Sequence, residues 1–340
     1  MRLRHRHPLL TLLVRSLLVL GALGLGGPQV WGGTTVWGAD YFPNVTLINQ
    51  DGKPVRFFDD LIKDKVVAVN FMFTSCKDVC PLETARMREV QEILGDRVGK
   101  DIFFISISID PQRDTPPVLK AYAQQYQAGP GWMFLTGKAE DITLIRHKLG
   151  LLSPDSDPGN LKGHSMSLII GNQSTGQWMK KSPYENAHIL ATQMGSWLSN
   201  WQQPSKAGLE YANAPRVRTV SLGENLFRTR CGACHTLGEE GTAALAKQVL
   251  APDLLGVTRR REQAWLSRWL REPDKMLAER DPQALALQAR YKNLVMPNLS
   301  LGVEDTQALM GYFEEETQRL EREHRPAKVA TATAVMAPCH

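Results

Sequence analysis

The residues best equipped for chemistry form the pattern Cys-x-x-Cys-His at Cys231, Cys234 and His235. The two thiols can add across the vinyl groups of a haem, and the adjacent imidazole can bind the iron as the proximal ligand. A Cys-x-x-Cys pair alone is also compatible with zinc binding or dithiol redox chemistry, but a histidine directly after it favours haem. The pattern therefore predicts a covalently attached c-type haem, and hence one-electron transfer.

A haem that only transfers electrons needs a sixth ligand, and methionine is the usual one. Met296 precedes Pro297, which favours an extended loop from which the thioether can point inward. The alternatives are Met276, in a polar segment, and Met310, which lies in the helical pattern of residues 304–321 and is expected to belong to the core. We predict that Met296 is the sixth ligand.

A second pair, Cys76 and Cys80, is spaced four residues apart. The apolar run 65–74 before it is typical of a buried parallel strand, and Pro81 suits the first turn of a helix. The cysteines are therefore expected at a strand-to-helix turn. There the helix dipole stabilises thiolates, and Lys77 adds positive charge.

Residues i and i+4 of a helical turn lie on one face, so both sulfurs can point to one metal ion. Two soft thiolates favour Cu(I) and also accept Zn(II). A trigonal site needs one more ligand, and His164 is the candidate because it ends a loop directly before a predicted strand. His147 and His188 fall on helical segments and are expected at the surface. The alternatives to His164 as the third ligand are Asp78 and His188.

The elements around Cys76 and Cys80 alternate between strand and helix patterns and close with a hairpin and a helix, which is the order of a thioredoxin-like sheet. The predicted strands are 65–74, 102–109, 132–136, 166–171 and 177–181, and the predicted helices are 82–94, 117–127, 140–149 and 184–201.

Residues 42–200 resemble the Sco/SenC family of copper-binding thioredoxin-like proteins. Three blocks carry the resemblance: Cys76-x-x-x-Cys80-Pro81, Asp110-Pro111-Gln112-Arg113-Asp114-Thr115-Pro116 and Gly163-His164-Ser165. The resemblance implies that Cys76, Cys80 and His164 bind copper. It also implies a role in assembling the copper centre of a respiratory oxidase or another exported copper enzyme, by copper delivery or by reduction of the target cysteines. The block 110–116 is interpreted as structural, ending a strand and starting a helix.

The sequence departs from the usual family pattern at three positions. Lys77 stands where a proline is common, and Ser167 and Ile170 stand in a strand where aromatic residues and an aspartate often follow the histidine. The copper ligands are unaffected, so these departures bear on partner specificity.

Residues 216–322 resemble class I cytochromes c. A predicted helix at 221–230 leads into the haem motif, and the stretches 251–257 and 265–270 resemble the middle of those proteins. The predicted fold class is therefore an α/β thioredoxin-like domain followed by an all-α mono-haem cytochrome c domain.

The N-terminus carries the pattern of an export signal. Residues 1–8 are basic, and residues 9–25 are apolar apart from Arg15, which predicts a signal peptide or an N-terminal membrane anchor and a periplasmic or periplasm-facing protein. Membrane contact is expected through residues 9–25. The predicted boundaries are 1–39 for the signal or anchor, 40–201 for the copper/dithiol domain, 202–215 for the linker, 216–322 for the cytochrome and 323–340 for a disordered tail.

Composition agrees with two folded domains in 340 residues, because the hydrophobic content is 43%. The net charge of +5 is modest and comes partly from the N-terminal arginines, so nucleic acid is not an expected partner. Cys339, beside His340 in the tail, is expected to be an unstructured odd thiol rather than part of a metal hook.

The sequence thus predicts an exported copper-binding protein with an attached haem c that exchanges electrons with redox partners. It is expected to be a metallochaperone and electron carrier rather than a conventional enzyme. Two alternatives remain: a thiol–disulfide oxidoreductase in which Cys76 and Cys80 cycle without metal, and an electron-transfer cytochrome whose Sco-like domain only docks a partner. His164 favours copper binding over the metal-free alternative, since dithiol exchange does not require it.

Overall fold

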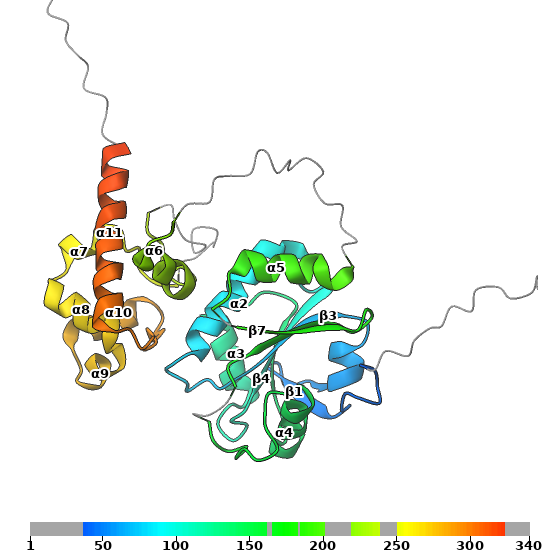
Figure 1. Ribbon diagram of the computed structural model, residues 1–340. Coiled ribbons are helices and arrows are strands. Elements are labelled where there is room, and N and C mark those ends of the chain that lie inside the picture. Colours follow the sequence, from blue (N-terminus) through cyan, green and yellow to red (C-terminus); the bar gives the residue numbers. More distant parts are fainter. Residues whose placement is uncertain (1–36, 162–164, 183, 201–218, 239–249, 324–340) are drawn as a thin grey trace, which may run out of the picture. The chain divides into compact units, whose positions relative to one another are not determined.

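The computed structural model describes residues 37–161, 165–182, 184–200, 219–238 and 250–323 (Figure 1). Residues 1–36 of the predicted export segment, the linker and residues 324–340 of the predicted tail lie outside the described residues. None of the helices within the described ranges is long and apolar enough to cross a membrane.

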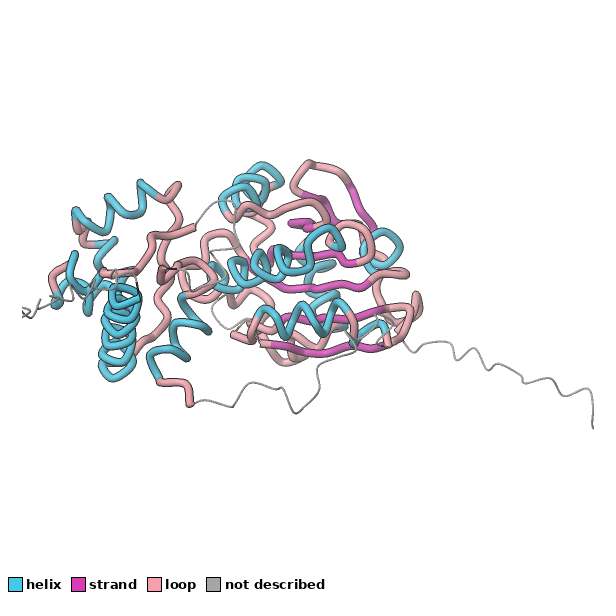
Figure 2. The backbone as a smooth tube through the Cα atoms, turned by 90° about the horizontal axis from the view of Figure 1, so that it is seen from above, coloured by secondary structure: helices cyan, strands magenta, loops and turns pink. Residues whose placement is uncertain are grey.

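The N-terminal part is built on a seven-stranded mixed sheet in the order β2-β1-β5-β4-β3-β6-β7 (Figure 2). The three central strands run parallel, and the strands outside them pair antiparallel. The strands are β1 (Thr46–Asn49), β2 (Pro54–Arg56), β3 (Val66–Met72), β4 (Ile102–Ser108), β5 (Trp132–Thr136), β6 (Leu168–Asn172) and β7 (Gln177–Lys181).

Helices cover both faces of this sheet, which explains why β3 is buried along its whole length. Val66, Ala68 and Met72 belong to the core under α2, α3 and α5, whereas alternate residues of β3 belong to the core on the opposite face, with α4 and the turn Phe57–Ile62. The helices are α2 (Cys80–Leu94), α3 (Pro116–Gln125), α4 (Ala139–Lys148) and α5 (Ala187–Gly195).

The C-terminal part is helical and closes through a contact between its first and last helices. A Cβ on Gly223 would lie 2.1 Å from the carbonyl oxygen of Ala308, so glycine allows α6 to approach α11 closely. The rings of Phe227 and Phe313 then meet edge to face at 6.3 Å. The helices are α6 (Leu222–Leu226), α7 (Val257–Arg260), α8 (Gln263–Arg271), α9 (Pro273–Ala278), α10 (Pro282–Arg290) and α11 (Val303–Glu323).

The predicted fold class is confirmed, with three differences in detail. β1 and β2 form a hairpin that was not predicted, and two helices that were also not predicted, α9 and α10, begin in the polar segment around Met276. The helix expected over 184–201 is shorter, because α5 ends at Gly195 and a 3₁₀ turn follows at Trp197–Ser199.

The ion pair of Glu314 makes the attachment of α11 sensitive to acid. Hydrogen bonds from Arg259, Thr258 and Gln318 lower the pKa of Glu314 to about 2, below its ordinary value of 4.5. A depressed folded pKa means that the stabilisation is complete above pH 4.5 and is lost as the pH falls toward 2.

We therefore expect Glu314→Gln to lower the melting temperature at neutral pH more than in acid. Thermal unfolding of the full chain, compared at about pH 3 and about pH 6, measures the difference. Glu321→Gln is the matched control, since Glu321 pairs only with the same arginine in the described residues. Equal losses for Glu314→Gln at both pH values would contradict this account.

Candidate copper and haem sites

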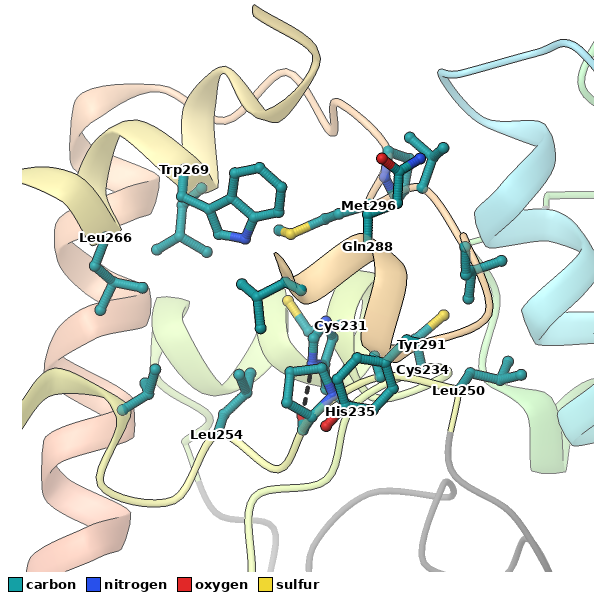
Figure 3. A pocket seen from close by; sticks show the side chains of 18 of the residues that line it. Cys231, Cys234, His235, Leu250, Leu254, Leu266, Trp269, Gln288, Tyr291 and Met296 are labelled. Atoms are coloured by element: carbon teal, nitrogen blue, oxygen red, sulfur yellow. Dashed lines mark hydrogen bonds between the residues drawn. The ribbon is translucent and has the colours of Figure 1, made fainter. Parts of the chain in front are cut away.

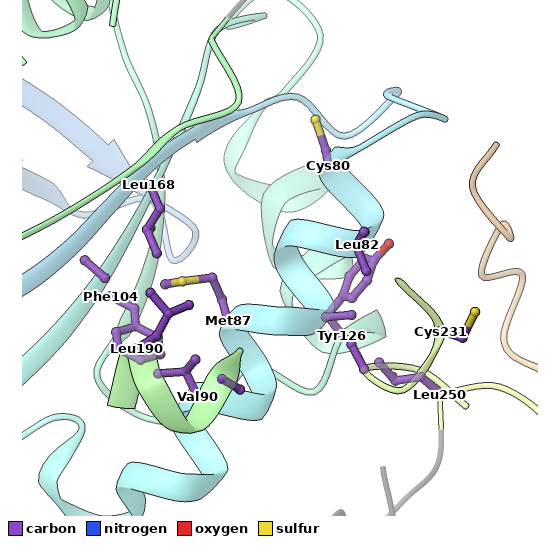
Figure 4. Packing of buried hydrophobic residues seen from close by; sticks show 14 of the residues in the cluster. Cys80, Leu82, Met87, Val90, Phe104, Tyr126, Leu168, Leu190, Cys231 and Leu250 are labelled. Atoms are coloured by element: carbon purple, nitrogen blue, oxygen red, sulfur yellow. The ribbon is translucent and has the colours of Figure 1, made fainter. Parts of the chain in front are cut away.

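Cys76 and Cys80 lie at the strand-to-helix turn that the sequence predicts. Cys76 is half-buried in the loop after β3, and Cys80 is the buried first residue of α2, with Pro81 in the first helical turn. Figure 4 shows Cys80 at the start of α2, while Met87 and Val90 of the same helix pack toward Phe104 and Leu190. Packing of the helix body thus fixes the N-terminal turn that carries the sulfur.

The two thiols interact directly. A hydrogen bond with Cys76 and burial together raise the pKa of Cys80 far above its ordinary value. The raised pKa of Cys80 opposes the thiolate stabilisation expected there from the helix dipole, because hydrogen bonding with Cys76 and loss of solvent both favour the protonated thiol. A metal ion that binds the Cys80 sulfur as a thiolate displaces this proton.

The position of the third expected ligand, His164, lies outside the described residues. Within the described part of the chain, no three His, Cys, Asp or Glu residues group as a metal site. β6 pairs antiparallel with β3, with Val69 opposite Ile169, so residues 165–167 approach the end of β3 that leads to Cys76. This topology brings the segment that begins at Ser165 to the cysteine end of the sheet.

Of the other two histidines of this domain, His188 lies at the surface as predicted, whereas His147, also expected there, does not. His188 is exposed on α5. His147 is half-buried on α4, where its Nδ1 lies 3.0 Å from the carbonyl oxygen of Leu152. Asp78 is exposed between the two cysteines.

The residues of the haem motif border a cavity of about 470 Å³ in the C-terminal part (Figure 3). Cys231, Cys234 and His235 lie on one side of it, and Met296 extends into it from the facing loop. Apolar side chains complete the lining, including Leu254, Leu266 and Trp269. An apolar cavity with two thiols, one imidazole and one thioether fits a covalently held haem with His and Met axial ligands.

The orientation of His235 also fits an iron ligand. Its Nδ1 lies 2.8 Å from the carbonyl oxygen of Pro252, and because a carbonyl only accepts, Nδ1 carries the proton and Nε2 is left as the basic nitrogen. Burial lowers the pKa of His235, which keeps the imidazole neutral. Burial also raises the pKa of Cys231 and Cys234 to about 12.

Asp253 holds the Pro252 loop in place, and the sequence analysis did not identify it. Its carboxylate accepts hydrogen bonds from the Thr236 hydroxyl, from the Gly238 amide at 3.0 Å and from the Leu255 amide at 2.8 Å. This side chain therefore ties the segment after the haem motif to the loop that orients His235. The signal available in the sequence was the position of Asp253 directly after Pro252.

The structure separates the three methionines that competed as the sixth ligand. Met296 lines the cavity. Met276 is 1% exposed and packs with Trp269 and Ala284 in a separate apolar cluster. Met310 is half-buried on α11. Of the three, Met296 alone borders the cavity, so the sixth-ligand assignment stays a prediction.

Each of the two parts of the chain matches a known protein family. Residues 38–197 match the SCO1/SenC family model, and residues 220–315 match the cytochrome c model. A SCO2-like protein of Rickettsia felis is 36% identical over 139 residues, which cover 39% of this chain and 65% of that protein. A SCO2-like protein of Rickettsia conorii is 36% identical over 154 residues, which cover 42% of this chain and 72% of that protein.

Among solved structures, a SCO1/SenC family lipoprotein from Bacillus anthracis is 32% identical. The match covers 46% of this chain and 94% of that one, with a TM-score of 0.40. The predicted fusion of two families is confirmed by the two separate family matches.

Proposed function

The chain belongs to the SCO1/SenC family and carries a cytochrome c domain, and from that premise we propose that it is an exported copper carrier with its own one-electron centre. Its clients are the copper centre of a respiratory oxidase or another exported copper enzyme. The observation that carries this proposal is the direct interaction of Cys76 and Cys80 at the start of α2.

Copper is the cargo, and Cys76, Cys80 and His164 are proposed to hold it. Two thiolates, one from the loop after β3 and one from the first residue of α2, suit Cu(I), and an imidazole adds the harder donor that Cu(II) needs. The same pair of thiols also fits reduction of the client's cysteines, so copper delivery and thiol reduction are both within reach of this site.

Copper titration of the purified haem-containing protein tests the ligand set. We expect one copper per chain, with His164→Ala weakening Cu(II) more than Cu(I), because two thiolates alone satisfy the softer ion. His147→Ala is the matched control, since His147 is a histidine of the same domain that lies on α4 and is not a candidate ligand. Unchanged Cu(II) affinity in His164→Ala would transfer the role to Asp78 or His188.

The C-terminal part is proposed to hold haem c: Cys231 and Cys234 would carry it covalently, and His235 and Met296 would bind the iron. When bound, the haem exchanges single electrons. The apolar side chains of Leu266 and Trp269 exclude water from the cavity. The carbonyl oxygen of Pro252 accepts a hydrogen bond from Nδ1 of His235 and so keeps the proton on that nitrogen.

Met296→Leu is expected to remove the sulfur-to-iron absorption band and to lower the reduction potential, because methionine ligation raises it. The measurement is the visible spectrum and redox titration of the oxidised protein. Met276→Leu is the control, since Met276 is buried in the neighbouring cluster and does not itself line the cavity. A band that survives in Met296→Leu and disappears in Met276→Leu would reverse the assignment.

The haem is proposed to set the oxidation state of the copper. Copper cycling between Cu(II) and Cu(I) takes one electron, as a haem does, whereas a disulfide takes two. A His/Met haem has a raised potential, and protein disulfides lie at roughly −120 to −300 mV, so a reduced haem is too weak to open a Cys76–Cys80 disulfide.

Export to the periplasm is proposed from residues 1–8 and 9–25, which carry the basic and apolar segments of a signal or anchor. Covalent haem attachment takes place on the exported side in bacteria, which agrees with this location.

A further inference from the structure

Asp114 is a fully buried carboxylate between the ends of two central strands. It accepts hydrogen bonds from the Thr74 amide at 3.0 Å, from the Thr74 hydroxyl at 2.5 Å and from the Ser108 hydroxyl at 2.6 Å. Burying a carboxylate is costly unless donors surround it, and here three neutral donors do so. A simple strand-to-helix connection does not require such a group.

Thr74 belongs to the turn that supports both cysteines. The Cys76 amide donates to the carbonyl oxygen of Phe73 at 3.1 Å. The Phe73 backbone also forms a hydrogen bond with Cys80 that opposes the rise in its pKa, so the Phe73 amide donates to the sulfur. Phe73 thus contacts both cysteines, and its neighbour Thr74 is held by Asp114 through backbone and side chain.

We propose that Asp114 is a positioning residue for the Cys76–Cys80 pair: by fixing Thr74, it holds the turn that keeps the two sulfurs together. Its consequence for copper rests on the proposed function, whereas its consequence for disulfide closure does not. Both outcomes depend on the effective concentration of one sulfur at the other, and a loosened turn lowers that concentration.

Two variants release the turn, and a third is the matched control. Asp114→Asn keeps the size but loses the charge, and Thr74→Val removes one donor from the turn. Ser108→Ala removes a donor to the same carboxylate from β4, which does not carry the cysteines. If Asp114→Asn fails to fold, Thr74→Val and Ser108→Ala still carry the comparison.

The experiment equilibrates the full haem-containing chain with glutathione buffers and measures the fraction of Cys76–Cys80 disulfide. Each disulfide formed reduces one oxidised glutathione to two reduced molecules, which receive the two thiol protons. We expect the equilibrium constant for closure to fall about tenfold in Asp114→Asn and Thr74→Val, the effect of losing one charge-assisted hydrogen bond. Ser108→Ala is expected to stay near wild type.

Melting temperatures and Cu(II) competition complete the test. Closure constants in Asp114→Asn and Thr74→Val that equal those of Ser108→Ala, at equal loss of melting temperature, would show a merely structural carboxylate and overturn the inference. The two proposals can also fail separately. If the wild-type chain binds no copper, but its disulfide-closure constant still exceeds those of Asp114→Asn and Thr74→Val, the proposed copper function is overturned and the role of Asp114 is supported.

Discussion

Cys80→Ser is expected to abolish high-affinity copper binding while leaving the haem in place. One thiolate and one imidazole make a poor Cu(I) site. The loss should exceed the roughly 10- to 100-fold effect of changes around a metal ligand, because a ligand itself is removed. Cu(I) competition with a chelator of known affinity measures it, and Cys76→Ser should behave alike.

Cys339→Ser is the control for this experiment, because Cys339 belongs to neither motif. Its copper affinity is expected to match wild type. Retention of wild-type Cu(I) affinity in both Cys76→Ser and Cys80→Ser would rule out the strand-to-helix turn as the copper site.

The double variant Cys231→Ala, Cys234→Ala is expected to lose covalent haem completely. His235 and Met296 still border the cavity in this variant, so any haem it retains should be extractable with acid-acetone. The measurement is the pyridine haemochrome of denatured protein after expression with a cytochrome c maturation system. Cys80→Ser serves as the reciprocal control, since it should keep covalent haem while losing copper.

Covalent haem that persists in the double variant would contradict attachment at the Cys-x-x-Cys-His motif. Wild-type protein that carries no covalent haem after expression with the maturation system would reject haem attachment altogether.

The sequence predicted the central strands well because burial on both faces leaves a clear signal. β5 begins and ends where predicted, and the apolar run of β3 was placed within two residues. The edge strand β7, which is only partly buried, also has the predicted bounds. The hairpin of β1 and β2 was missed because its strands are short and partly exposed, although Gly52, with φ of +76°, marks the turn between them.

The residues of the candidate sites could be identified where their spacing in the sequence indicates the chemistry. Properties that depend on tertiary packing were harder to predict. The two cysteine motifs named their residues directly. The burial of Met276 depends on Trp269 and Ala284, which no local pattern links to it. The raised pKa of Cys80 depends on Cys76 and on burial, and these oppose the helix-dipole stabilisation that the sequence suggested.

The role of Asp114 shows the same limit. The sequence places it in a block that ends a strand, but its hydrogen bonds run to Thr74, 40 residues earlier. Only the parallel pairing of β3 and β4 brings the two segments together.

The most direct test of the account is stopped-flow mixing that starts from Cu(II)-loaded protein with reduced haem and follows haem oxidation. The account predicts oxidation of one haem per copper at a rate independent of protein concentration, and its absence in Cys76→Ser. No haem oxidation within minutes, with copper confirmed bound, would contradict electron exchange between the two sites and leave the fusion as a tether.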